Sequence, residues 1–241
     1  MIQIILISGG TSGIGLATAA IVAKEGYRPV LLGRNEARGK AAEAKAPGSV
    51  FVPCDVTKTE DCKKAVQVAA GLGKITGLVI SAGKYEEKLL ENTTDEEMED
   101  YFAVNVFGAM KLTREVIPFM RGTKGSIVTV ASDAAIQGNV QCSLYGATKG
   151  ALMAFTRSLA LELAVEDIRA NVVCPGDVDT PLLDNQLQTY GGSREEMGQW
   201  YPLGRIGKAE EIGEVIAFLL SPKSSFMTGA VIPVDGGLTD W

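Results

Sequence analysis

The sequence contains no histidine, and this absence excludes more kinds of chemistry than any other feature of its composition. Without an imidazole, the chain can form no Ser-His-Asp or Cys-His nucleophilic triad, no HExxH zinc site and no histidine general base. Any catalysis must therefore use Tyr, Lys, Asp, Glu, Ser or Cys. The 4 cysteines are scattered without a CxxC pair or metal-ligand spacing. We expect free thiols, a cytoplasmic location and no metal site.

Long apolar runs and runs of basic residues are also missing. No stretch approaches the ~20 apolar residues of a membrane span, and the apolar segment 2–7 is too short for a signal sequence. The net charge of −6 carries no basic cluster, which argues against a nucleic-acid partner. With 241 residues, of which 46% are hydrophobic, the chain can bury a large core without disulfides.

Short apolar runs alternate with helix-patterned stretches along the whole chain. The expected strands are Gln3–Ile7, Val30–Leu32, Val50–Val52, Gly77–Ile80, Ser126–Val130, Ala170–Val173 and Ala230–Val234. The clearest helical patterns are Gly13–Lys24, Lys58–Ala70, Tyr145–Ala164 and Glu210–Leu220. This alternation predicts an α/β fold: a single-domain, Rossmann-type doubly wound parallel sheet of about seven strands, with helices on both faces. The domain is expected to span 1–241, with a substrate lid at about 181–204, where the pattern is lost.

A glycine-rich turn lies between the first expected strand and the first expected helix. Gly9, Gly13 and Gly15 follow a GxxxGxG spacing. Such a turn lets a pyrophosphate approach the backbone, and the N–H groups at the start of the helix then face the anion. In this position of an alternating α/β chain, the turn predicts a dinucleotide site.

The end of the second strand reports on which dinucleotide is bound. NAD sites usually place Asp or Glu here for the ribose 2′-hydroxyl, whereas an arginine suits a 2′-phosphate. This chain has Gly33, Arg34 and Asn35 at that point and no acid. We therefore expect NADP(H) to be favoured over NAD(H), although Ser12 leaves the turn without a second basic residue.

Tyr145 and Lys149 lie four residues apart, and therefore on one face of the predicted helix. A phenol has a pKa of about 10, and a cation within ~4–6 Å would lower it and allow proton exchange with a carbonyl or alcohol oxygen. Ser132 follows the fifth strand, at the edge where parallel sheets bind ligands. Asn105 lies in an apolar helical run, where a buried amide needs partners.

In this order, these residues resemble the short-chain dehydrogenase/reductase family. Further matches are Pro175-Gly176 followed by Thr180, and the tail motifs Pro202-Leu-Gly-Arg-Ile-Gly, Glu210-Glu211-Ile, Thr228-Gly229 and Val234-Asp235-Gly236-Gly237, so that the resemblance covers residues 2–238. It implies that Tyr145 is the general acid in reduction and the base in oxidation, and that Lys149 lowers its pKa and holds the nicotinamide ribose. It also implies that Ser132 orients the substrate oxygen and that Asn105 positions a water linked to Lys149.

The resemblance further implies the residues that contact the cofactor. Asp55 would meet the adenine and Thr180 the carboxamide. The expected set is Gly9, Thr11, Ser12, Gly13, Ile14, Gly15, Arg34, Asp55, Val56, Ser81, Ala82, Gly83, Tyr145, Lys149, Pro175, Gly176, Val178 and Thr180. One departure concerns Ile80-Ser81, where the family usually has Asn-Asn. This change puts the locking of neighbouring strands and part of the ribose contact in doubt.

We therefore expect an oxidoreductase that interconverts a ketone or aldehyde and an alcohol, with a small ketone, sugar, steroid or keto-ester as substrate. Candidate pocket residues are Asp133, Gln137, Cys142, Asp177 and the segment Leu182–Trp200. The tail resembles that of 3-oxoacyl-acyl-carrier-protein reductases, which makes that activity an alternative. A non-catalytic redox sensor and a lyase or isomerase on the same fold are others. By resemblance, the partner is a second copy of the chain, in a homotetramer or homodimer.

Overall fold

The computed structural model describes residues 1–241 as one α/β domain built on a seven-stranded parallel sheet. The strands are β1 (Gln3–Ser8), β2 (Arg28–Gly33), β3 (Val50–Pro53), β4 (Lys74–Ile80), β5 (Ser126–Val130), β6 (Arg169–Pro175) and β9 (Val231–Val234), in the spatial order β3-β2-β1-β4-β5-β6-β9. All seven predicted strands are confirmed, with ends that differ by a few residues. The chain reverses its direction across the sheet between β1 and β4, which are direct neighbours.

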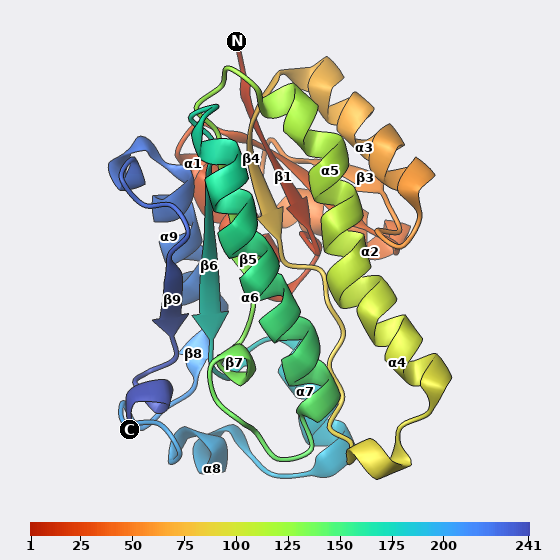
Figure 1. The fold of residues 1–241 in the computed structure, drawn as a ribbon, viewed down its shortest axis with the longest axis vertical. Helices are drawn as coiled ribbons and strands as arrows, with labels where there is room; N and C mark the ends of the chain where they lie inside the picture. Colours follow the sequence, from red (N-terminus) through yellow and green to blue (C-terminus); the bar gives the residue numbers. More distant parts are fainter.

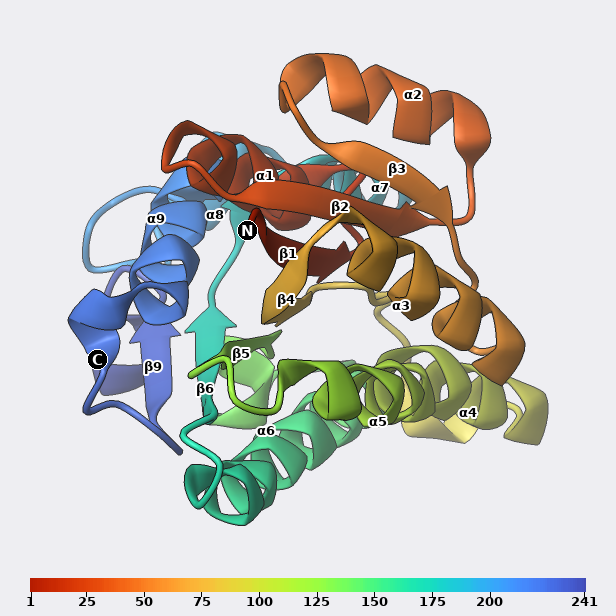
Figure 2. The same cartoon turned by 90° about the horizontal axis from the view of Figure 1, so that it is seen from above.

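Helices cover both faces of the sheet. Figure 2 shows α1 (Gly13–Lys24), α2 (Glu36–Lys45) and α9 (Ala209–Leu220) on one side, and α3 (Thr59–Leu72), α5 (Gly108–Met120) and α6 (Ser143–Ala164) on the other. Each side encloses its own buried apolar cluster. The strands feed both clusters alternately, since Ile4 and Leu6 point to one and Ile5 and Ile7 to the other. This explains why the strands read as continuous apolar runs.

The remaining elements gather at the carboxyl ends of the strands (Figure 1). They are α4 (Asp95–Phe102), α7 (Pro181–Tyr190), α8 (Arg194–Gly198) and the small pair β7 (Val178–Asp179) and β8 (Gly207–Lys208). A π-helical segment, Ala103–Phe107, joins α4 to α5. None of the helices is both long and apolar enough to span a membrane.

The segment at about 181–204, where the loss of pattern suggested a long loop, is largely helical, because α7 and α8 form there. Helix α7 starts with Pro181 in its first turn, where proline's fixed φ is compatible with a helix and its missing N–H costs nothing. Only Leu183 of this helix is buried. Without an apolar stripe along one side, the helix leaves no periodic signal in the sequence.

Candidate active site

A single large cleft of about 1350 Å³ lies across the carboxyl ends of the strands, with polar and apolar residues in its walls. It runs from the end of β2 past the glycine turn and Tyr145 to α7. Every predicted site residue lines this cleft except Gly15 and Asn105, which lie directly behind its wall. The candidate substrate residues Asp133, Gln137, Cys142 and Asp177 line it too. The structure therefore brings together segments that are far apart in the sequence.

The glycine turn is packed so tightly that side chains cannot replace its glycines. Gly9 has a φ of +67°, and a Cβ there would lie 2.8 Å from the Ala82 nitrogen. A Cβ at Gly15 would lie 2.4 Å from the Gly9 carbonyl oxygen. Ser12 precedes α1 without a side-chain cap, so the first N–H groups of this helix are left for an anion. This cradle fits the pyrophosphate of a dinucleotide.

Two arginines flank the end of β2 at one extremity of the cleft. Arg34 was predicted to lie there. Arg38 was not, and it lines the same cleft from the first turn of α2. The Asn35 side chain caps this helix by accepting a hydrogen bond from the Arg38 nitrogen at 2.8 Å. Asp55 lies opposite, where hydrogen bonds from Thr57 and the charge of Arg34 lower the pKa of its carboxyl against the effect of burial.

At Ile80-Ser81, where the locking of neighbouring strands was in doubt, Ser8 joins β1 to β4 and to the loop that follows it. The Ser8 hydroxyl donates to the Val79 carbonyl at 3.3 Å and accepts from the nitrogens of Ser81 and Ala82 at 3.2 and 3.3 Å. A hydroxyl on β1 thus makes this connection in a chain that lacks the two amides expected after β4 from the resemblance. A buried serine ending an apolar strand was the only sequence signal for this role.

Asn105 is fully buried in the π-helical segment between α4 and α5. Its Oδ1 accepts from the Lys84 nitrogen at 2.8 Å, and its Nδ2 donates to the Lys84 carbonyl at 3.1 Å and to the Thr148 hydroxyl at 3.1 Å. A Cβ on Gly83 would approach Asn105 Oδ1 to 3.4 Å and Lys149 Nζ to 3.6 Å, so both groups face the same glycine. The π-bulge, a feature frequent at functional sites, aims the amide at this point.

Tyr145 and Lys149 lie one turn apart on α6, at the centre of the cleft. The Lys149 ammonium lies 5.5 Å from the centre of the Tyr145 ring and donates to the Val130 carbonyl at 3.0 Å. Burial lowers the pKa of Lys149 to about 8. Burial also raises the pKa of Tyr145, and the carboxylates of Asp133 and Asp177 raise it further against the effect of Ser132.

The expectation that Lys149 holds the pKa of Tyr145 below its ordinary value is therefore not met in the structure. Desolvation raises the pKa of Tyr145 instead, and the negative charges of Asp133 and Asp177 add to this effect. The phenol keeps its proton at neutral pH and is set to donate it. This arrangement suits a general acid.

Ser132 follows β5 and faces the same space as Tyr145. Its hydroxyl donates to Asp133 Oδ1 at 2.7 Å and accepts from the Ala134 nitrogen at 3.2 Å. Asn139 donates to the second oxygen of Asp133 at 2.9 Å. Ser132 must therefore turn from the carboxylate to donate to another oxygen in the cleft.

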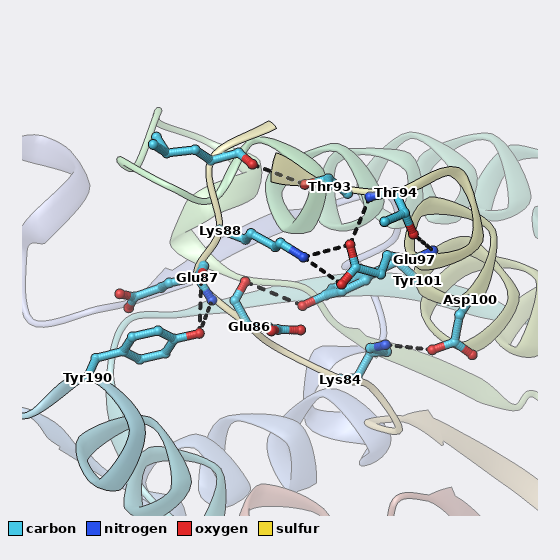
Figure 3. A network of polar contacts seen from close by, with 11 residues as sticks. Lys84, Glu86, Glu87, Lys88, Thr93, Thr94, Glu97, Asp100, Tyr101 and Tyr190 are labelled. Atoms are coloured by element: carbon cyan, nitrogen blue, oxygen red, sulfur yellow. Dashed lines mark hydrogen bonds and ion pairs between the residues drawn. The ribbon is translucent and has the colours of Figure 1, made fainter. Parts of the chain in front are cut away.

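The segment Lys84–Lys88, here called the strap, was not predicted as part of the site. Figure 3 shows it between α7 and α4: the Tyr190 hydroxyl donates to the Glu87 carbonyl at 2.9 Å and accepts from the Glu87 nitrogen at 3.1 Å. On the opposite side, Lys88 bonds both carboxylate oxygens of Glu97, at 2.6 and 2.8 Å. The strap thus connects α7 to α4, the helix that leads into the π-helical segment with Asn105.

The strap also carries Tyr85 into contact with the central tyrosine. The two rings meet edge to face, with centroids 4.7 Å apart and planes at 82°. The Tyr85 hydroxyl donates to Glu87 Oε1 at 2.8 Å and lies 3.6 Å from the Cys142 sulfur. Nothing in the spacing of the strap residues predicted this contact, because it joins positions 60 residues apart.

Comparison with known proteins agrees with this geometry. Residues 9–239 match a family model described as enoyl-(acyl carrier protein) reductase. The chain is 37% identical over 240 residues to a 3-oxoacyl-[acyl-carrier-protein] reductase of Mus musculus, covering 99% of this chain and 98% of the mouse protein. The crystal structure of levodione reductase superimposes with a TM-score of 0.94 at 29% identity, over 99% of this chain and 98% of that one. A structure of ElxO with NADP bound gives 0.93 at 26% identity, over the whole of both chains. This chain belongs to the short-chain dehydrogenase/reductase family of oxidoreductases.

Proposed function

We propose that the protein is an NADP(H)-dependent oxidoreductase that interconverts a ketone or aldehyde and the corresponding alcohol, with Tyr145 as general acid and base. The observation that carries the proposal is the convergence of Ser132, Tyr145, Lys149 and Asn105 at the middle of a cleft that begins at a glycine cradle. A nicotinamide dinucleotide bound in this cleft supplies or accepts the hydride.

Residues of the chain then provide proton transfer, stabilisation of charge and positioning. Tyr145 keeps its proton at neutral pH, since even an ordinary phenol has a pKa of about 10, and it gives this proton to a carbonyl oxygen in reduction. Ser132 turns from Asp133 to donate to the same oxygen and so stabilises the charge that develops there. Lys149, whose pKa is about 8, carries a positive charge at neutral pH that favours the phenolate left behind. Asn105 holds the strap through Lys84 and faces Lys149 across Gly83.

Tyr145→Phe tests the chemistry. The variant keeps the ring that packs on Tyr85 but loses the proton, so oxidation and reduction should fall by at least about 10²-fold. Affinity for NADPH, measured by fluorescence titration, should stay within about twofold. Unchanged turnover followed by nicotinamide absorbance would contradict the assignment of Tyr145.

The NADP(H) preference is supported by Arg34 and Arg38, which line the same end of the cleft. Arg34→Ala should raise the KM for NADPH by about tenfold and leave that for NADH nearly unchanged, because only the former carries a 2′-phosphate. Arg28→Ala is the matched control, because Arg28 is the first residue of β2 and does not line the cleft. Equal shifts for both cofactors would show that Arg34 does not read the phosphate.

The substrate is proposed to be a small ketone, sugar, steroid or keto-ester. The mouse relative favours 3-oxoacyl-acyl-carrier-protein reduction as a second candidate. Acyl carrier proteins are acidic, and this chain has a net charge of −6 with Glu162, Glu166 and Asp167 at the end of α6 and just beyond it. Long-range attraction between the two would be poor. A panel of small ketones and a carrier-bound 3-oxoacyl thioester, followed by nicotinamide absorbance, separates the two substrates.

The proposed assembly is a homodimer or homotetramer in which α5 and α6 face a second copy. These helices lie side by side on the outside of the molecule (Figure 1) and expose Phe119, Leu161 and Val165, the last two to 75% and 89%. Exposed apolar patches of this kind mark contact surfaces. Sedimentation of the purified protein tests the assembly. We also propose that the protein acts in the cytoplasm.

A further inference from the structure

Three carboxylates line the substrate end of the cleft, beyond Tyr145. Glu87 comes from the strap after β4, Asp133 follows β5, and Asp177 follows β6. We call this group the acid wall. Its members reach one space because the carboxyl ends of neighbouring parallel strands meet at one edge of the sheet.

The acid wall has only neutral partners. Glu87 accepts hydrogen bonds from Tyr85 and Gln186 on a single oxygen, at 2.8 and 2.6 Å. Asp177 accepts from the Tyr201 hydroxyl at 2.7 Å, also on one oxygen. The second oxygens of Glu87 and Asp177 therefore have no protein partner, and the bonds that Asp133 makes to Ser132 and Asn139 are neutral as well.

The cations that line the cleft do not neutralise the wall. Lys84 pairs with Asp100 on the outer side of the strap (Figure 3), and Lys149 donates to the Val130 carbonyl. Arg34 and Arg38 lie beside α2, at the other end of the cleft. The substrate end therefore carries three negative charges and no positive one.

The three groups are close enough to act on one another. Burial raises the pKa of the Asp177 carboxyl, and the charges of Asp133 and Glu87 raise it further. Carboxylates that are partly desolvated and have no opposite charge nearby favour a cation among them. A metal ion does not fit, since no three acidic or thiol groups of the chain are arranged to hold one.

We propose that the acid wall selects substrates that carry a positive charge close to the reacting carbon, namely amino ketones and the corresponding amino alcohols. This inference rests on the proposed oxidoreductase function. It makes the cleft unfavourable for keto acids and for phosphate-bearing acyl carriers, whose charge the wall repels.

Two ketones of the same shape, one cationic and one neutral, measure the effect of a positive charge on the substrate. The 1,1-dimethyl-4-oxopiperidinium ion carries a permanent positive charge where 4,4-dimethylcyclohexanone has a neutral carbon. The cation should be reduced with a kcat/KM higher by roughly tenfold or more, as expected for unit charges a few ångströms apart in a partly desolvated site. The anion 4-oxocyclohexanecarboxylate should be the poorest substrate.

Variants of the acid wall show whether it causes the preference for the cationic ketone. Asp177→Asn and Glu87→Gln keep the shape and the acceptor for the neighbouring hydroxyl, and together they should reduce the preference to less than about threefold. Glu86→Gln is the matched control, because Glu86 lies on the same strap with its side chain exposed outside the cleft. It should leave the preference unchanged.

The outcomes separate this inference from the function on which it rests. Equal kcat/KM for the cation and its neutral isostere, or a preference that survives the double variant, overturns the role of the acid wall. If no ketone is turned over, the proposed function fails. Quenching of NADPH fluorescence by the two compounds then still measures whether the cleft prefers the cation, and equal affinities would again overturn the inference.

Discussion

At the scale of single residues, the chemistry of the site is governed by burial. Tyr145 and Lys149 are both shifted toward their neutral forms, the phenol upward and the amine to a pKa of about 8. Desolvation disfavours whichever form is charged, so a tyrosine and a lysine move in opposite directions. The two pKa values therefore move apart, so that Tyr145 holds its proton firmly while the pKa of Lys149 comes close to neutrality.

The lowered pKa of Lys149 has a consequence for stability. An unfolded lysine binds its proton below about pH 10.4, whereas the folded one does so only below about 8. Between these values the unfolded chain holds the extra proton, so the wild type gains stability as the pH rises from 8 to 10. Below 8 the buried ammonium costs its full penalty.

Lys149→Met should therefore stabilise the protein at pH 7 by roughly 1–3 kcal/mol, after the loss of the bond to Val130 is included. The advantage should shrink as the pH approaches 10, while activity is lost at every pH. Denaturant unfolding at pH 7 and pH 10 measures this. A variant less stable than the wild type at pH 7 would show that the buried ammonium is fully compensated in the native state.

At the scale of elements, the strap links α7 to the centre of the site. This helix buries only Leu183, and its contacts with the strap are the bonds of Tyr190 and Gln186 to Glu87. Elements with few buried apolar contacts open at low free-energy cost. We therefore treat α7 and α8, within residues 181–204, as the proposed substrate lid.

Tyr190→Phe should loosen this lid without touching the reacting atoms. It removes both hydrogen bonds to the Glu87 backbone, each worth about 1 kcal/mol, so the substrate KM should rise by about three- to tenfold with little change in the affinity for NADPH. Amide hydrogen exchange in α7 should accelerate. Thr189→Val is the control, because Thr189 bonds only within its own helix. Equal rates of amide exchange in α7 of the two variants would show that the strap does not hold the lid.

The same elements show where prediction from sequence succeeds and where it stops. Apolar runs and glycine spacing are local signals, so β1, α1 and the turn between them were predicted with almost correct ends. The bond from Ser8 to the loop after β4 and the contact of Tyr85 with Tyr145 join distant segments through hydroxyl and ring geometry. No periodicity encodes such contacts, and the acid wall likewise exists only after the sheet has assembled.

At the scale of the whole molecule, the absence of histidine shapes the response to pH. No side chain of the chain has an ordinary pKa between about 5 and 8, the interval in which imidazole titrates. The four cysteines are free and buried. Within the site, Lys149 is the group whose pKa of about 8 lies nearest to neutrality, and Asp177 is the acid whose pKa burial raises.

The reductive kcat/KM should therefore be nearly constant from pH 6 to 7 and fall through an inflection near 8, as Lys149 loses the charge that favours proton donation by Tyr145. An inflection that disappears in Asp177→Asn, a variant that leaves Lys149 in place, would contradict this and assign the titration to the Asp177 carboxyl, whose pKa burial raises. A profile that stays flat from pH 6 to 9 would show that the charge of Lys149 does not control the reaction.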